Sequence, residues 1–134
     1  MLKLNRLLVV MSVERATASA AMNELQHTAF KAFLMEYDLP YDEAVGYYKG
    51  TEEKSFVIQC QDFADVGRLQ EQAALADQEC IMIVDARNKS FLYYPETCHL
   101  EQLGYMFQFN RAENPLRDIP DACTILGDEV YYAV

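Results

Sequence analysis

The stretch from Tyr37 to Lys54 holds the densest set of chemically useful side chains in the sequence. Four tyrosines and five carboxylates lie in it: Tyr37, Tyr41, Tyr47, Tyr48, Asp38, Asp42, Glu43, Glu52 and Glu53. Carboxylates pair with organic cations, and aromatic faces attract them through cation–π contacts. The stretch therefore predicts a binding site for a cationic small molecule. Because tyrosines are common in strands and charges near a turn are often solvated, the same composition also fits an ordinary exposed hairpin.

Strand alternation separates the two adjacent glutamates of this stretch. Counted back from Phe56 and Ile58, the alternation places Glu52 on the face of these apolar residues. Lys54 shares that face, and Glu53 lies on the opposite one. We therefore expect Glu52 to point towards a buried face, where a carboxylate needs a partner or a purpose. A reset of the alternation at the preceding turn would exchange the two glutamates.

Common nucleophile and metal-binding motifs are not found in the sequence. It has no GxSxG, Walker loop or GxGxxG segment. The two histidines have no metal-ligand spacing, and we expect His27 to be a solvated residue on the polar side of a helix. His99 directly follows Cys98, and adjacent side chains point apart on an extended chain. The four cysteines form no CxxC pair, which favours reduced thiols. We therefore expect no metal site and no cofactor.

The net charge restricts the possible partners. The 134 residues include 11 basic and 21 acidic side chains, which give a formal net charge of −10. Such a surface repels nucleic-acid phosphates and anionic membranes and attracts cations. No apolar run approaches the roughly 18 residues of a membrane span, and the run Leu7–Met11 is short for a signal peptide. We predict a cytoplasmic protein with no nucleic-acid or membrane partner.

Two segments have the periodicity of helices. The first covers residues 17–37 and ends before Pro40, which cannot continue a helix. Its apolar stripe consists of Met22, Leu25, Ala29 and Phe33, widened by Phe30 and Leu34. The second begins at Asp62, a favoured N-cap residue. Its apolar stripe consists of Phe63, Val66, Leu69, Ala73 and Ala76. We expect both stripes to be buried.

Short apolar runs predict the strands. They are Leu7–Val13, Ala44–Lys49, Lys54–Cys60, the two runs that flank Arg87–Lys89, Gln102–Asn110 and two short runs about Gly127–Asp128. The first six elements follow the order strand, helix, strand, strand, helix, strand. This order predicts a ferredoxin-like (split βαβ) α+β fold with additional C-terminal strands, in one domain spanning residues 1–134.

In a ferredoxin-like fold, both helices cover one face of an antiparallel sheet. The other face must then be buried by something else. With two long helices available, the economical solution is a second copy of the chain. We therefore predict that the protein oligomerises through its sheet.

The hairpin segment resembles the small phage-encoded S-adenosylmethionine hydrolases, which are also described as S-adenosylmethionine lyases. Gly46-Tyr47-Tyr48-Lys49, followed by Thr51-Glu52-Glu53-Lys54-Ser55, is similar to that family's Gly-x-Tyr-basic and Thr-Glu-Glu-Lys-Thr segments, with a shorter connection. The strand LLVVMSVER is similar to the family's opening strand, and Cys60 and Cys80 fall where the family has cysteines. The resemblance covers roughly residues 7 to 95.

This resemblance implies degradation of S-adenosylmethionine to 5′-methylthioadenosine. The second product is L-homoserine lactone if the substrate's carboxylate attacks its own γ-carbon, or homoserine if water attacks. We favour the lactone because intramolecular attack gains from proximity and no tuned general base is visible. The implied catalytic residues are Glu52 and Glu53, and the implied substrate-binding residues are Tyr41, Tyr47, Tyr48 and Lys54. The resemblance also implies a homotrimer with intersubunit active sites, which counters restriction–modification in the cytoplasm of a host bacterium.

Two functions of other classes stay open at this point. One is a non-enzymatic trimeric sensor that binds an adenine ligand between subunits. The lack of a glycine-rich or basic phosphate loop counts against it. The other is an acidic anti-restriction protein that mimics DNA. Many of the carboxylates fall in predicted caps, turns and helix faces, so the charge has an explanation without mimicry.

Overall fold

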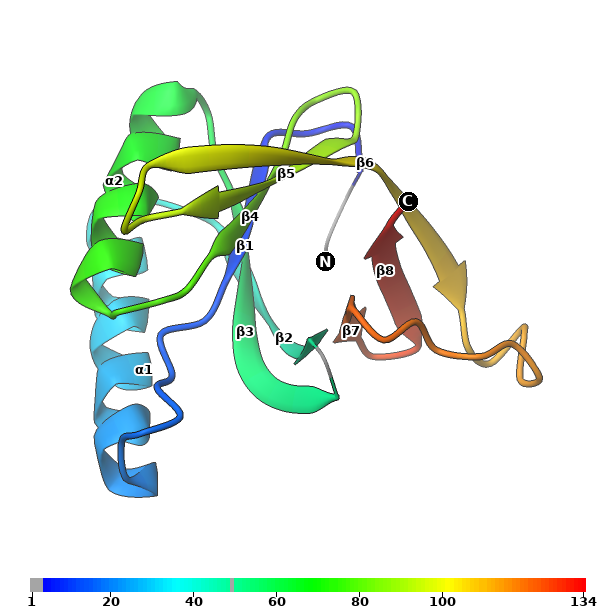
Figure 1. Ribbon diagram of the computed structural model, residues 1–134, viewed down its shortest axis with the longest axis horizontal. Coiled ribbons are helices and arrows are strands. Elements are labelled where there is room, and N and C mark those ends of the chain that lie inside the picture. The colour runs from blue at the N-terminus through cyan, green and yellow to red at the C-terminus, as the bar shows by residue number, and fades with distance from the viewer. Residues whose placement is uncertain (1–3, 49) are drawn as a thin grey trace.

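A computed structural model describes residues 4–48 and 50–134, and its strands form one closed antiparallel barrel (Figure 1). The strands are β1 (Leu8–Met11), β2 (Tyr41–Tyr48), β3 (Thr51–Gln59), β4 (Ile81–Val84), β5 (Lys89–Tyr94), β6 (His99–Asn110), β7 (Cys123–Leu126) and β8 (Glu129–Ala133). Around the barrel they follow the order β1-β3-β2-β7-β8-β6-β5-β4. The helices α1 (Ala20–Glu36) and α2 (Phe63–Leu75) lie together outside the barrel, on one side of it (Figure 1).

The predicted ferredoxin-like fold class is wrong. The first six elements do follow the expected order, and β4, β1, β3 and β2 are neighbours in the sheet. The sheet does not end at β2 and β4, because β7 pairs with β2 and the ladder continues through β8, β6 and β5 back to β4. The C-terminal strands were expected as elements, but periodicity within a strand does not encode its partner. Lys49, the end of one expected strand, lies outside the described residues.

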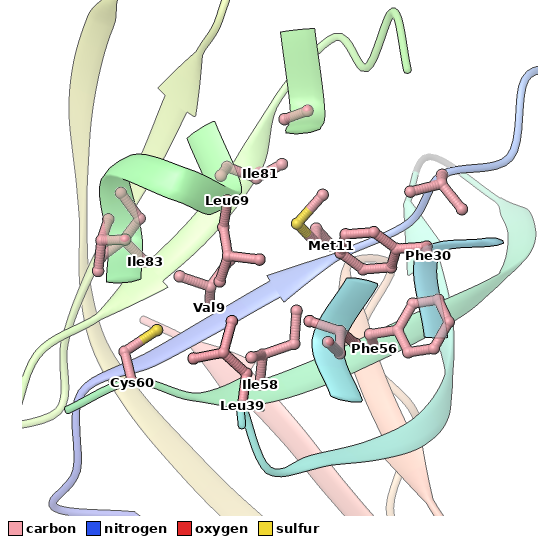
Figure 2. Packing of buried hydrophobic residues seen from close by; sticks show 14 of the residues in the cluster. Val9, Met11, Phe30, Leu39, Phe56, Ile58, Cys60, Leu69, Ile81 and Ile83 are labelled. Atoms are coloured by element: carbon pink, nitrogen blue, oxygen red, sulfur yellow. The ribbon is translucent and has the colours of Figure 1, made fainter. Parts of the chain in front are cut away.

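Closure of the barrel gives the sheet two buried faces. The outer face of β1, β3 and β4 packs against the helices, as the cluster around Val9, Phe56 and Leu69 shows (Figure 2). The inner face forms a second cluster across the barrel: Leu8, Val10, Ala44, Val57, Val84, Met106 and Tyr131. Chain closure therefore buries the face that was expected to need a second copy. The prediction of oligomerisation through an open sheet is wrong for this reason.

Helix α2 matches its prediction closely. The side chain of Asp62 accepts a hydrogen bond from the backbone N–H of Asp65 (3.1 Å) and caps the helix. Four members of the expected stripe are buried: Val66, Leu69, Ala73 and Ala76. Phe63 at the helix start is 72% exposed, so its expected burial is wrong. Neither helix in residues 4–48 and 50–134 has the length and apolarity needed to cross a membrane.

Helix α1 buries only part of the expected stripe, namely Phe30 and Leu34 with Phe33 partly buried beside them. Ser19 caps its start by accepting a hydrogen bond from the N–H of Met22 (3.1 Å). The buried residues are His27, Phe30 and Leu34, whereas Met22 and Leu25 are exposed. Apolar residues occur on several sides of this helix, so periodicity alone does not select one face.

His27 is buried rather than solvated as expected. Its ring stacks on Phe56 with centroids 4.4 Å apart, and its Nε2–H donates to Glu43 Oε1 (2.7 Å). A polar side chain in this position is tolerated because it is hydrogen-bonded to a charged partner. His27 therefore joins α1 to β2 and is part of the structural core.

Val134 extends the pairing between β6 and β8 by one residue. Tyr105 and Val134 exchange two backbone hydrogen bonds of 2.9 Å each, just beyond the last residue of β8. Gly104 lies beside this pair with a φ of +122°, and a Cβ atom added to it would lie 2.2 Å from the Val134 carbonyl oxygen. Only glycine fits this close approach of two backbones.

Candidate active site

The β2–β3 hairpin divides the predicted site residues between the two faces of the barrel wall. Tyr47 pairs with Glu52 across the hairpin, and Gly46 pairs with Glu53. Side chains alternate between faces, so Glu53 shares the inner face with Val57 of the inner cluster. Tyr48 is also on the inner face. The six predicted residues therefore do not form one group.

Tyr47 and Glu52 form a pair on the outer face. The Tyr47 hydroxyl donates to Glu52 Oε2 (3.2 Å), and both loss of hydration and the neighbouring Glu52 raise the pKa of Tyr47. Glu52 is exposed. Glu52 does share the face of Phe56 and Ile58, as the alternation predicted. The expected burial of Glu52 is wrong, because the helices cover this face at Phe56 and Ile58 and leave it open at Glu52.

Tyr41 and Lys54 are also on the outer face, where both have structural contacts. Tyr41 packs edge-on against Phe56, with ring centroids 5.7 Å apart, at the margin of the cluster beneath the helices. The Lys54 Nζ lies 3.1 Å from Glu24 Oε2 of α1. This contact raises the pKa of Lys54 and lowers that of Glu24. Lys54 thus helps to hold α1 against the hairpin, whereas Tyr41 packs within the hairpin at the edge of the core.

Glu53 is the half-buried carboxylate of the hairpin. Burial raises its pKa, and the charge of Glu14 raises it further. Glu14 lies in the segment after β1, and its Oε1 accepts a hydrogen bond from the backbone N–H of Lys54. The carboxylates of Glu53 and Glu14 therefore lie beside the same short segment of β3. Such an arrangement favours a cation in the space beside them.

Tyr48, on the hairpin face of Glu53, connects this pair to groups of other strands around Tyr94. Loss of hydration raises the pKa of Tyr94, at the end of β5, and the charges of neighbouring groups raise it further. Those groups, in decreasing effect, are Glu101, Cys80, Tyr48 and Glu79. Tyr48 and Glu53 share one face of the hairpin. We call the residues Glu14, Tyr48, Glu53, Tyr94 and Glu101 the acidic barrel end.

A surface cleft adjoins the acidic barrel end at Tyr94. It has a volume of about 770 Å³ and lies between the C-terminal end of α2 and the β5–β6 turn. Its lining residues are Ala74, Asp77, Gln78, Glu79, Tyr94, Pro95, Glu96 and Thr97. The three carboxylates and the tyrosine in this lining also attract cations, and the cleft is large enough for a small molecule.

The described residues contain no group of three or more His, Cys, Asp or Glu side chains arranged to hold a metal ion. None of the four cysteines forms a disulfide in residues 4–48 and 50–134. Burial raises the pKa of the Cys60 thiol to about 12, which keeps it protonated and poorly nucleophilic. The acidic barrel end thus consists of carboxylates and tyrosines, with the thiol of Cys80 as a neighbour of Tyr94.

Glu14, Tyr94 and Glu101 were missed by the sequence analysis. They are separated from Glu53 by about 40 residues or more along the chain, and only strand register and barrel closure bring them near it. The one local signal was the position of Glu14, a charged residue directly after the apolar run of β1. That signal does not indicate a partner.

Fold and site together define a β-barrel domain with two outer helices and an anionic, tyrosine-containing end suited to an organic cation. A comparison with protein-family models matches residues 9–134 to the S-Adenosylmethionine lyase family. The chain belongs to this family, as the TEEK hairpin predicted, and the match continues beyond residue 95. The family name indicates an enzyme that cleaves S-adenosylmethionine, a sulfonium cation. A comparison with curated protein sequences gives no significant match.

Proposed function

We propose that this protein is an S-adenosylmethionine lyase that releases 5′-methylthioadenosine and L-homoserine lactone. The observation that carries this proposal is the family match over residues 9–134, on a chain whose half-buried Glu53 shares its face of the hairpin with Tyr48. In the reaction, a carboxylate oxygen of the substrate forms a bond to the γ-carbon. The bond from that carbon to sulfur breaks, and its electron pair neutralises the sulfonium.

Lactone formation makes modest chemical demands on the protein. The leaving group is a neutral thioether, and the nucleophile belongs to the substrate, so the main task is to fold the methionine tail into the reactive shape. Glu53 binds the substrate's ammonium group, which leaves the substrate carboxylate free to attack. Tyr48 and Tyr94 contact the sulfonium and the adenine ring, since both are attracted to aromatic faces.

We further propose that the enzyme is a homotrimer with active sites between subunits, as the resemblance implies. The barrel wall separates Glu53 on its inner face from Glu52 and Tyr47 on its outer face. In the proposed trimer, a substrate lies between two copies of the chain and contacts the inner face of one and the outer face of the other. In this arrangement Glu52 is supplied by the neighbouring subunit, whereas Lys54 holds the hairpin against α1 and Tyr41 packs on Phe56.

If the gene is carried by a phage, the activity would deplete S-adenosylmethionine in the cytoplasm of the host bacterium. Restriction–modification systems that need this methyl donor would then be weakened. The acidic surface supports this role only indirectly, through its preference for a cationic small molecule over nucleic acid.

The proposal is tested by incubating the purified protein with S-adenosylmethionine and following 5′-methylthioadenosine by liquid chromatography and mass spectrometry. The reaction is run with and without EDTA, and a sample without protein corrects for spontaneous breakdown. We expect 5′-methylthioadenosine above this background in both conditions. Binding of S-adenosylmethionine without any turnover would instead support the sensor function, and neither binding nor turnover would reject both.

An oxygen label separates the lyase from the hydrolase. In H₂¹⁸O, attack of water on the γ-carbon places the label in the hydroxyl group of homoserine. Lactone formation gives an unlabelled lactone first, and its later opening at the carbonyl places the label in the carboxyl group. Unlabelled lactone at early times is the expected result. Label in the hydroxyl group would assign the reaction to a hydrolase, with Glu53 as the candidate general base.

A further inference from the structure

Glu14 replaces a missing strand partner next to Glu53. The β1–β3 ladder runs as far as the pair Met11 and Phe56, where β1 ends. Two residues earlier on β3, the N–H of Lys54 is bonded by the side chain of Glu14 instead of by backbone. The carboxylate thus extends the pairing of β3 towards the hairpin turn, up to the residue adjacent to Glu53.

The backbone that carries Glu14 is clamped between the two helices. The Gln78 side chain donates to the carbonyl of Glu14 (2.7 Å), just after α2. Arg15 donates to the carbonyls of Ala76 (3.0 Å) and Leu75 (2.9 Å), and its backbone N–H and C=O are both bonded by the Asn23 side chain. A carboxylate on a backbone held at so many points has little freedom to leave its partner, which suits a positioning role.

In the described part of the chain, the titratable groups around Glu53 come from both strands of the hairpin and from Glu14. Directly across the hairpin lies Gly46, and the titratable residues of β2 on the same face are Tyr48 and, further along the strand, Asp42. The ammonium of Lys54 is on the opposite face, bonded to Glu24. Among the described residues, Glu14 is the charged group that raises the pKa of Glu53, after the larger effect of burial.

We propose that Glu14 is a positioning residue for Glu53: it fixes the β3 backbone beside Glu53 and places a second negative charge next to the substrate's cationic groups. The effect on turnover rests on the proposed function, whereas the coupling between the two carboxylates does not. Removing the charge of Glu14 lowers the pKa of Glu53, because one of the two causes of its elevation is lost. Since Glu53 binds a cation as a carboxylate, the acid limb of the activity profile then moves to lower pH.

Three variants separate these effects. Glu14→Gln keeps an acceptor for the Lys54 N–H and removes the charge, and Glu14→Ala removes both. Glu24→Gln is the matched control, because Glu24 is a carboxylate bonded to the Lys54 side chain on the outer face. The pKa of Glu53 is measured by NMR titration of its carboxyl carbon. The dependence of kcat/KM on pH is measured in the 5′-methylthioadenosine assay, with circular dichroism to check the fold.

In Glu14→Gln we expect a lower pKa for Glu53 and an acid limb moved to lower pH, with both unchanged in Glu24→Gln. In Glu14→Ala we expect in addition a fall in kcat of about tenfold at the pH optimum, a loss typical of an orienting hydrogen bond to a charged group. An unchanged pKa of Glu53 in folded Glu14→Gln overturns the inference. So does an equal shift in Glu24→Gln. If the wild-type protein makes no 5′-methylthioadenosine, the proposed function fails, and the NMR titration still decides the coupling.

Discussion

Glu53→Gln is the substitution that most directly tests the acidic barrel end. It keeps the size of the side chain and removes a half-buried charge that lies beside a second carboxylate. If Glu53 binds the substrate ammonium, loss of this charge-assisted hydrogen bond costs about 1.5–3 kcal/mol, or roughly 10- to 150-fold in kcat/KM. The assay is release of 5′-methylthioadenosine over a range of substrate concentrations. The sequence alone predicts the larger loss for Glu52→Gln, and the burial of Glu53 reverses this expectation.

The stability of the same variant has a definite sign. The pKa of Glu53 is raised above the ordinary value of 4.5, so ionising it destabilises the folded state. This destabilisation is absent below pH 4.5 and develops as the pH rises through the raised pKa. Glu53→Gln should therefore unfold at higher urea concentration than the wild type at pH 7, and at the same concentration at low pH.

This combination of gained stability and lost activity is what distinguishes a binding carboxylate from a structural one. Glu52→Gln, measured alongside, removes an exposed carboxylate and should change stability by no more than about 1 kcal/mol. A Glu53→Gln protein that is less stable than the wild type at pH 7 would refute the conclusion that ionised Glu53 destabilises the fold and serves binding. Full activity in Glu53→Gln together with loss in Glu52→Gln would move the ammonium site to the outer face.

Three other predictions follow from the fold. Gly104→Ala should lower the free energy of unfolding in urea titrations by at least about 2 kcal/mol, because the added Cβ would clash with the Val134 carbonyl and the backbone has a positive φ. An unchanged midpoint would contradict the close approach of the two backbones. Glu43→Gln should be less stable than the wild type above pH 4.5 and equally stable at low pH, because the hydrogen bond from His27 lowers the pKa of Glu43. A difference in stability that does not change with pH would argue against this cause. Light scattering should give the mass of a trimer, and a stable 15.4 kDa monomer at micromolar concentration would reject the intersubunit site.

Local patterns in the sequence determined most of the secondary structure and the family. Asp62 caps a helix because its side chain competes for nearby N–H groups, an effect that needs only three further residues. The strand periods and the TEEK hairpin are likewise local, and the hairpin by itself indicates the S-adenosylmethionine lyase family. The prediction that Glu52 and Glu53 lie on opposite faces of β3 was also correct, because side-chain alternation depends on that strand alone.

Only the tertiary structure decided what covers each face. A period of two tells which side chains share a face, but not whether a helix, another strand or solvent lies over it. Glu52 was expected to be buried because Phe56 shares its face, yet α1 and α2 do not cover that end of β3. Glu53 became half-buried because β5 to β8 close the sheet around its side. Closure depends on registers between strands far apart in the chain, and Glu14 meets β3 through the same long-range geometry, which no local pattern records.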